Sequence, residues 1–449
     1  MTLKKSEQWS SKIGFILAAA GSAIGLGAIW KFPYMAGTNG GGVFFLLFIL
    51  FTILIGTPIL LAEFVIGRRG GGNAVTSYRA LAPASMWPLV GYFGTFISLV
   101  ILSFYSVVGG WILSYLARSV SGGLSGMSQE EYGALFESII SKPGEVLLAQ
   151  LIFMIMTILV VKGGIKTGIE RASKFMMPSL FVLFLILLVR SLTLEGAMEG
   201  VRYLLQPDWS YLTSETVLLA LGQSFFALSV GISVMVTYSS YLPKTENMPN
   251  SAFSVAGLNI LISLLAGLVI FPSVFALGFE PDVGPGLVFV VIPAVFNEIA
   301  FGGLFLTIFL VLLLFATLTS AFSILEIIVA VMEKGNPRKR GKSAWFAGAL
   351  VFVVGIPSAL SFGVLTDYQI IGLPFFDFAD FIASNIGLPV GALLISIFTA
   401  YVLKKSDVKE ELQRGSGMSD GLFETLYFLI RFIVPIAIIA VFLNSMGIL

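Results

Sequence analysis

Residues 21–27 of this 449-residue chain read Gly-Ser-Ala-Ile-Gly-Leu-Gly and lie inside a long apolar segment. Glycine inside a helix costs about 1 kcal/mol relative to alanine, so three glycines in seven residues favour a local loss of helical pairing. A second interruption, Leu-Ser-Val-Gly-Ile-Ser at residues 228–233, follows five apolar segments later. Unwound backbone survives in a membrane only where it is buried in protein or lines a cavity. Paired breaks of this kind point to the central site of a transporter.

The alternative is that these glycines only let neighbouring helices approach closely. We favour close packing for Gly14, Gly109 and Gly348. In residues 21–27 a serine shares the segment and a second interruption matches it, which favours unwinding.

The composition indicates an all-α polytopic membrane protein. Hydrophobic residues make up 57% of the chain and charged residues 11%, against about 25% charged in a soluble domain, and the mean hydropathy is +0.97. Apolar runs of about 20 residues, long enough to cross a bilayer, recur along the chain. Eleven transmembrane helices are predicted, near residues 13–37, 43–67, 88–117, 146–162, 175–193, 214–240, 252–277, 302–333, 344–363, 376–403 and 422–446.

Breaks in the first and sixth spans predict a five-plus-five inverted repeat within one domain, residues 1–449. The repeats are residues 13–193 and 214–403, and residues 422–446 form an extra helix. Twenty of the 26 Lys and Arg residues lie in the segments on the side of the N-terminus, and four lie in the loops opposite. Because cytoplasmic loops are rich in Lys and Arg, this predicts a plasma-membrane protein with a cytoplasmic N-terminus and an extracellular C-terminus.

The chain has no His and no Cys, which excludes Ser-His and Cys-His nucleophiles, thiolate metal sites and disulfides. A membrane enzyme is therefore disfavoured. The net charge of +1 gives no reason to expect a nucleic-acid partner.

A broken helix presents free N–H groups at one end and free C=O groups at the other. The N–H end suits a carboxylate, whereas the carbonyl end suits a hard cation or an ammonium group. An α-amino acid accompanied by Na⁺ satisfies both ends.

Polar side chains within the apolar spans are further candidate ligands. Thr319, Ser320 and Asn259 lie mid-span, although hydroxyl groups also bond to carbonyls of their own helix. Glu63 is placed to accept hydrogen bonds from the unwound sixth span. Asp377, Asp380 and Lys31 lie near the predicted outer mouth, where they form either a gating ion pair or an ordinary interfacial salt bridge.

These residues resemble a known family. Residues 21–34, Gly-Ser-Ala-Ile-Gly-Leu-Gly-Ala-Ile-Trp-Lys-Phe-Pro-Tyr, are similar to the first-helix signature of the neurotransmitter:sodium symporters. Residues 39–42, 223–229, 237–241 and 284–289 also match, and the similarity spans nearly the whole chain. The chain resembles an eleven-spanning bacterial subgroup, and the resemblance implies inward transport of amino acids on a Na⁺ gradient.

The resemblance implies two sodium sites. The second would use the carbonyls of Gly21, Ile24 and Ala316 and the hydroxyls of Thr319 and Ser320. The first would use the carbonyls of Ala23 and Ala227 and the side chain of Asn259. Ala28 and Ala227 stand where the family has side-chain oxygens, which puts the first site in question. Phe48 and Ala227 also lack the hydroxyls of the chloride-binding relatives, so we expect no chloride requirement.

For the substrate, the resemblance implies that the carboxylate meets the N–H groups of Leu26 and Gly27 and the Tyr105 hydroxyl. The ammonium group would meet the carbonyls of Ala23, Phe226 and Ala227 and the Ser229 hydroxyl. The side-chain pocket would comprise Ile101, Tyr105, Phe226, Ile232, Ser320 and Ile324. This lining favours hydrophobic amino acids such as Trp, Leu or Phe.

Lys31 and Asp380 match the outer gate of the family, while Ser6 stands where its inner gate has Arg. Gly168 and Pro178 in the fifth span are expected either to unwind and release sodium inward or to form a static kink. The expected gating residues are Lys31, Asp380, Glu63, Gly168 and Pro178. A proton-coupled carrier of the same architecture and a non-transporting amino-acid sensor remain the alternative functions.

Overall fold

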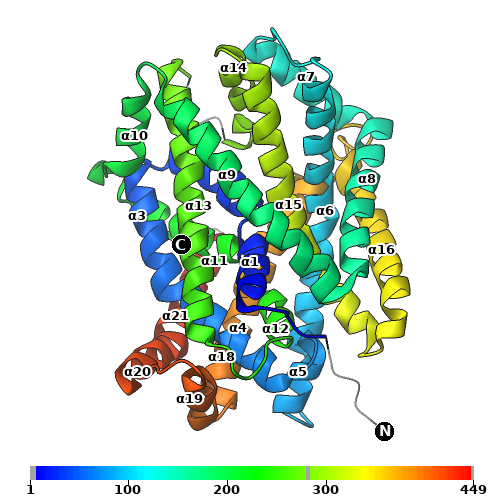
Figure 1. Ribbon diagram of the computed structural model, residues 1–449, viewed down its shortest axis with the longest axis vertical. Coiled ribbons are helices and arrows are strands. Elements are labelled where there is room, and N and C mark those ends of the chain that lie inside the picture. Colours follow the sequence, from blue (N-terminus) through cyan, green and yellow to red (C-terminus); the bar gives the residue numbers. More distant parts are fainter. Residues whose placement is uncertain (1–6, 280–283, 446–449) are drawn as a thin grey trace.

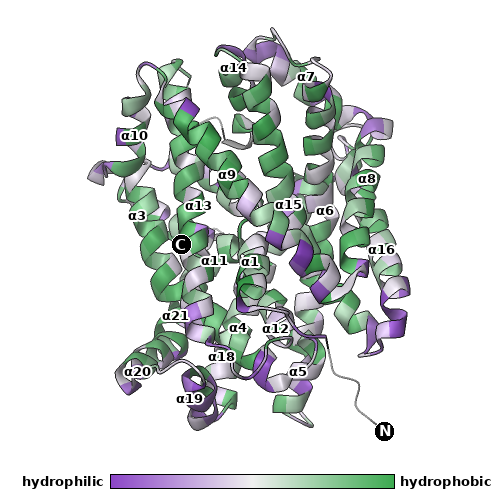
Figure 2. Cartoon of the chain, viewed as in Figure 1, coloured by the Kyte–Doolittle hydropathy of each residue, from purple (hydrophilic) through white to green (hydrophobic). Residues whose placement is uncertain are grey.

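The computed structural model describes residues 7–279 and 284–445, and these residues form a nearly all-helical bundle (Figure 1). The long helices run roughly parallel to the longest axis of the molecule. Hydrophobic residues cover most of their length, and hydrophilic residues gather toward the two ends (Figure 2). This distribution is that of a protein whose flanks face hydrocarbon.

Among the described residues, nine helices are long and apolar enough to cross a membrane. A tenth span arises if the bent pair Lys12–Ala23 (α1) and Gly27–Thr38 (η1 and α2) is taken as one. The predicted count of eleven also requires the broken sixth span, and it stays a prediction. The nine helices are Gly42–Gly70 (α3, η2, α4), Pro88–Val120 (α6), Pro143–Lys162 (α8), Ile165–Leu192 (η3, α9), Met248–Ala276 (α13), Gly302–Glu333 (α15), Pro337–Leu360 (η6, α16), Phe375–Val402 (α17, η7, α18, η8) and Asp420–Asn444 (α20, η9, α21).

Both predicted interruptions are present, and each is shorter than the sequence suggested. Residues 21–23 are still helical, and α1 ends before Ile24 and Gly25, where the chain bends by 52°. The sixth span consists of Ser214–Leu228 (α11) and Val234–Ser239 (α12) with five non-helical residues between them. Ser229 and Ser233 there have φ of +52° and +63°, a region that non-glycine residues seldom occupy.

Several elements outside the predicted spans are helical as well. The fifth span, predicted over residues 175–193, begins earlier, at Ile165, because Ile165–Glu170 (η3) and Arg171–Leu192 (α9) form one span. A two-residue antiparallel pair, Gln369–Ile370 (β1) with Leu373–Pro374 (β2), is an exception to the all-α expectation. The short connecting helices are Ala74–Leu81 (α5), Gln129–Ser141 (α7), Ala197–Leu205 (α10), Trp209–Tyr211 (η4), Gly284–Leu287 (η5), Val291–Asn297 (α14) and Lys405–Gln413 (α19).

The two ends of the molecule differ in the helices they carry. In Figure 1, α7, α10 and α14 lie at one end, and α5 and α19 lie at the other, near the start of the described chain. Of the charges and the chain end on which the predicted orientation rests, Lys4, Lys5 and Leu449 lie outside the described residues.

A buried ion pair fastens α19 to the end of α4. Arg68 Nε donates to Glu411 Oε1 at 2.6 Å, and the two side chains are 0% and 2% exposed. Two further Arg68 nitrogens donate to the backbone carbonyls of Glu246 and Glu411. The guanidinium group thereby joins three segments, and its charge has no access to water.

We predict that Glu411→Ala destabilises the protein by about 3–5 kcal/mol, because it leaves the Arg68 charge buried without its carboxylate. Glu424→Ala is the matched control, since its 2.6 Å pair with Lys405 is about half exposed and contributes at most about 1 kcal/mol. Thermal unfolding in detergent, followed by tryptophan fluorescence, measures both. Equal shifts for the two variants would contradict the structural role of the buried pair.

Candidate substrate and ion site

The two breaks border one small central cavity. Its lining contains ten of the eleven residues predicted to bind substrate, all except Ala227, and adds Ser22, Gly25 and Leu388. The cavity measures about 30 Å³, the volume of roughly one water molecule. The site is therefore assembled but contracted around its centre. The predicted residues that line it are Ala23, Leu26, Gly27, Ile101, Tyr105, Phe226, Ser229, Ile232, Ser320 and Ile324.

Hydroxyl groups form hydrogen bonds with the backbone groups that the first break leaves unpaired. The Leu26 N–H donates to the Tyr105 hydroxyl at 3.3 Å. The Ser22 carbonyl accepts from the hydroxyls of Ser229 at 2.9 Å and Ser320 at 3.1 Å. Three elements, α6, α15 and the sixth-span break, thus meet at the first break.

The sixth-span break is held by the fully buried carboxylate of Glu63 in α4. One oxygen accepts from the N–H of Gly231 at 2.7 Å, and the other accepts from Met235 at 3.0 Å and Val236 at 3.3 Å. The contact predicted for Glu63 is present. Gly231 has φ of +98°, and a Cβ there would lie 2.4 Å from the Leu388 carbonyl, so only glycine fits.

Of the residues predicted for the second sodium site, Gly21 lies in the last turn of α1 and Ile24 at the break, while Ala316, Thr319 and Ser320 lie on α15. A Cβ on Gly21 would lie 3.0 Å from Thr319 Cβ, which shows how closely the two helices approach. The Thr319 hydroxyl donates to the carbonyls of Phe315 and Ala316, each at 3.0 Å. Ile24 is the residue at which α1 ends.

The residues predicted for the first sodium site are in direct contact. Asn259 Nδ2 donates to the carbonyls of Ala23 at 3.2 Å and Ala227 at 2.9 Å. Its Oδ1 is buried and has no hydrogen-bond partner among the described residues. Within the described part of the chain, no group of three or more acidic side chains is placed to hold a metal ion.

The positions compared with the chloride site carry few groups for an anion. Phe48 is fully buried in an apolar cluster. Gln223 Nε2 donates to the Gly27 carbonyl at 2.7 Å. Gln223 Oε1 and Ser263 Oγ are buried without a partner in the described structure.

The predicted outer-gate pair is not formed. Lys31 Nζ lies 4.3 Å from the centre of the Phe226 ring, an arrangement that the negative face of the ring favours. Asp380 accepts from the Ser384 hydroxyl at 2.7 Å. Both residues lie in the described part of the chain, and no ion pair joins them. In this conformation each charge has another partner, and the gating role of the pair stays a prediction.

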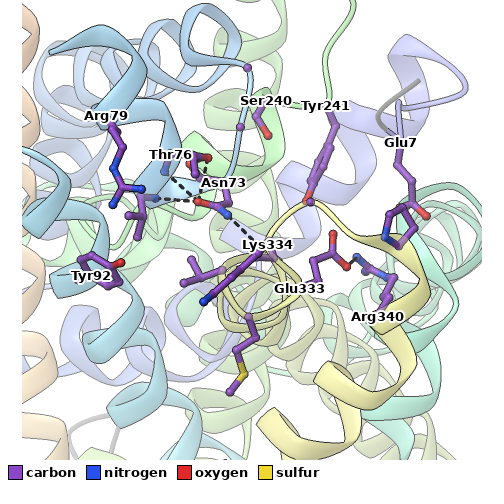
Figure 3. A pocket seen from close by; sticks show the side chains of 18 residues that line it. Glu7, Asn73, Thr76, Arg79, Tyr92, Ser240, Tyr241, Glu333, Lys334 and Arg340 are labelled. Carbon is purple, nitrogen blue, oxygen red and sulfur yellow. Dashed lines mark hydrogen bonds and ion pairs between the residues drawn. The ribbon is translucent and has the colours of Figure 1, made fainter. Parts of the chain in front are cut away.

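A larger cavity of about 690 Å³ lies on the side of α5. Figure 3 shows Tyr241 pointing toward Glu333 and Arg340 at its edge. The Tyr241 hydroxyl donates to Glu326 at 3.0 Å, and the Arg340 guanidinium forms a buried ion pair with Glu326. The group of Tyr241, Glu326 and Arg340 was not predicted from the sequence, although a glutamate inside the span 302–333 indicates a buried ionisable group with a partner. Ser6, expected at the inner gate, lies outside the described residues.

Gly168 and Pro178 lie in one continuous span. Gly168 belongs to the π-helical turn Ile165–Glu170 (η3), where a Cβ would lie 2.1 Å from the Val160 carbonyl. Pro178 lies inside Arg171–Leu192 (α9). The segment is wound in this structure, so its unwinding stays a prediction.

Two facing helix breaks inside an apolar bundle, with carbonyl and hydroxyl oxygens turned to one cavity, define a membrane transporter of small solutes. A sequence model of the sodium:neurotransmitter symporter family matches residues 6–134 and 129–448. The chain belongs to this family. It is therefore an integral membrane, sodium-dependent transporter and not an enzyme.

Relatives and a solved structure agree with this assignment. The chain is 58% identical to an uncharacterized sodium-dependent transporter, YhdH, of Bacillus subtilis over the full length of both proteins. It is 36% identical to an uncharacterized sodium-dependent transporter of Haemophilus influenzae, with 99% of each chain covered. A similar solved structure is the crystal structure of MhsT in complex with L-phenylalanine, whose sequence is 46% identical to this chain. The match covers 98% of this chain and 100% of the MhsT chain, and the two structures superpose with a TM-score of 0.90.

We predict that Glu63→Gln loosens the sixth-span break. The substitution removes the charge that three N–H groups share, and hydrogen bonds to a charged group contribute about 1.5–3 kcal/mol each. Since 1.4 kcal/mol is a factor of ten, the amides of Gly231, Met235 and Val236 should exchange hydrogen at least about tenfold faster, as measured by mass spectrometry. Unchanged exchange at these amides, with Glu195→Gln as the control on an exposed carboxylate, would show that Glu63 does not hold the break.

Proposed function

We propose that the protein is a sodium-coupled symporter that imports hydrophobic aliphatic and aromatic L-amino acids by alternating access, with its N-terminus in the cytoplasm and its C-terminus outside. The observation that carries the proposal is the central cavity, where the two breaks offer polar backbone groups and the remaining lining is uncharged, with a few hydroxyl groups among apolar side chains. Such a site suits a zwitterion with an uncharged side chain.

In this proposal the carboxylate takes the N–H groups of Leu26 and Gly27. The Tyr105 hydroxyl now lies 3.3 Å from the Leu26 nitrogen, and it is placed to turn toward an arriving carboxylate as a donor. The ammonium group takes the carbonyls of Ala23, Phe226 and Ala227 and the Ser229 hydroxyl. These groups lie at the carbonyl end of the broken helices, where a cation is favoured.

The substrate side chain would occupy the space among Ile101, Ile232 and Ile324, with Tyr105, Phe226 and Ser320 completing the pocket. No charged side chain lines the central cavity, so a charged amino acid would lose its hydration without compensation. Because the cavity now holds about 30 Å³, binding must widen it, and Phe226 is the half-buried side chain at its edge. The complex of MhsT with L-phenylalanine supports an aromatic substrate.

Sodium would bind at two places. At the second site, the carbonyls of Gly21, Ile24 and Ala316 and the hydroxyls of Thr319 and Ser320 would surround the ion. At the first site, Asn259 would turn its amide so that its unpartnered Oδ1 faces the ion together with the carbonyls of Ala23 and Ala227. Oxygen ligands of this kind suit a hard cation. Phe48 and Ala227 supply no hydroxyl for an anion, so chloride is not required.

Alternating access would divide the molecule into the two repeats, residues 13–193 and 214–403, with residues 422–446 as an added helix. The cavity beside α5 would be the cytoplasmic vestibule. Lys31 and Asp380 would pair only when the outer gate closes further, and Gly168 and Pro178 would let α9 unwind as sodium leaves.

The experiment is uptake and binding of labelled L-phenylalanine by purified protein in proteoliposomes. Uptake should require sodium, persist when gluconate replaces chloride, and be inhibited by Trp and Leu but not by Lys or Glu. Gly25→Ala should abolish binding, because a Cβ there would lie 2.7 Å from the Tyr105 hydroxyl and 2.9 Å from Ser320. Gly257→Ala is the control, since no atom lies within 4 Å of its Cβ position.

Three outcomes would contradict the proposal. Uptake driven by a proton gradient without sodium would favour a proton-coupled carrier. Binding without counterflow would indicate a sensor. Full binding by Gly25→Ala would place the site elsewhere.

A further inference from the structure

The first and fifth spans are linked at their N-termini by two carboxylates. The buried carboxylate of Glu170, at the end of η3, accepts from the Ser10 N–H at 2.8 Å and from the Ser10 hydroxyl at 2.5 Å, just before α1 begins. The Ser11 hydroxyl, at the N-cap of α1, donates to the same carboxylate at 3.2 Å. In the opposite direction, Glu7 Oε2 accepts from the N–H of Ile165, the first residue of η3, at 2.8 Å.

Glycines make both approaches possible. A Cβ on Gly14 would lie 2.0 Å from Glu170 Oε1. A Cβ on Gly164, whose φ is +89°, would lie 2.6 Å from Glu7 Oε1. Larger residues at these two positions would push each carboxylate away from its hydrogen-bond partners.

The first N–H groups of any helix lack partners within that helix, and a carboxylate there also meets the positive end of the helix dipole. Caps usually come from the residues just before the helix. The cap of α1 is local, because the Ser11 hydroxyl accepts from the Gly14 N–H at 3.1 Å, and Glu170 holds the residues just before that helix. The first N–H of η3 instead finds its acceptor in Glu7, 158 positions away in sequence. If α1 tilts outward, Glu170 and Ile165 lose their partners together, so the start of the fifth span is freed at the same moment.

The fifth span also borders the proposed second sodium site. Met177 Sδ would lie 3.2 Å from a Cβ on Gly21, so α9 covers the site from this side. Glu170 lies two helical turns before Met177. The π-helical turn Ile165–Glu170 ends at Glu170 itself, and Pro178, which removes a backbone donor, directly follows Met177.

We propose that Glu170 is a positioning residue for sodium release: its link to Ser10 makes the opening of α1 and the loosening of η3 one event, so that the cytoplasmic path to sodium opens only when both move. The inference rests on the proposed function. Lys174 Nζ, 2.6 Å from Glu170 and 3.3 Å from Ser10 Oγ, completes the charged surroundings of the link.

The absence of native cysteine allows a clean test. Ser240→Cys places one thiol on the lining of the cavity beside α5, and its labelling by a maleimide is timed with and without sodium in detergent. Sodium should slow labelling about fivefold or more in this parent. Glu170→Gln should bring the rate in sodium to within about twofold of the sodium-free rate, whereas Glu195→Gln should behave like the parent.

Two further variants distinguish the loss of the Glu170–Ser10 link from a failure to fold. Adding Ser10→Ala to Glu170→Gln should change the rate less than twofold, because both substitutions act on the same link. Ser10→Ala alone, which leaves the Glu170–Lys174 pair intact, should give an intermediate rate and serves if Glu170→Gln does not fold.

Two results overturn the inference, and they are distinguishable. If sodium slows labelling equally in the parent and in the folded Glu170 or Ser10 variants, the link does not govern opening and the proposed function stands. If sodium leaves the parent unaffected, the proposed sodium coupling fails and this inference fails with it.

Discussion

The structure depends on how the backbone groups released by two helix breaks are satisfied away from water. An unpaired N–H or C=O group in an apolar environment costs several kcal/mol, so each break needs dedicated partners. Glu63 provides acceptors for three N–H groups of the sixth span. In the first span, the Ser22 carbonyl receives two hydroxyls from elsewhere in the fold.

These partners differ in how easily their hydrogen bonds can be exchanged. In the proposed cycle, this difference lets the site open while the surrounding bundle stays rigid. Glu63 is a buried, multiply bonded support. By contrast, the hydroxyls of Tyr105, Ser229 and Ser320 and the amide of Asn259 are neutral and turn about single bonds. In the proposed cycle they hold the free backbone groups until an amino acid and sodium arrive, and then they become ligands themselves.

Periodicity and composition were enough to predict most of the architecture. The span predicted at residues 302–333 matches α15 at both ends, and both breaks occur within the predicted stretches. The breaks are shorter than the glycine run suggested, because α15 and its neighbours pack against residues 21–23 and keep them helical. The contact of Glu63 was predictable since a carboxylate in an apolar span must find donors. The Tyr241–Glu326–Arg340 group and the Glu170–Ser10 link were not, because each joins residues from separate spans whose approach only the folded bundle determines.

The most direct test of the central claim is an experimental structure of the protein with sodium and L-phenylalanine bound. We expect density for the substrate carboxylate at the N–H groups of Leu26 and Gly27, and density for sodium among Gly21, Ile24, Ala316, Thr319 and Ser320. We also expect the Tyr105 hydroxyl to turn toward the carboxylate. Phenylalanine bound outside the two breaks, with the contacts of Ser22 and Leu26 unchanged, would contradict this mode of binding.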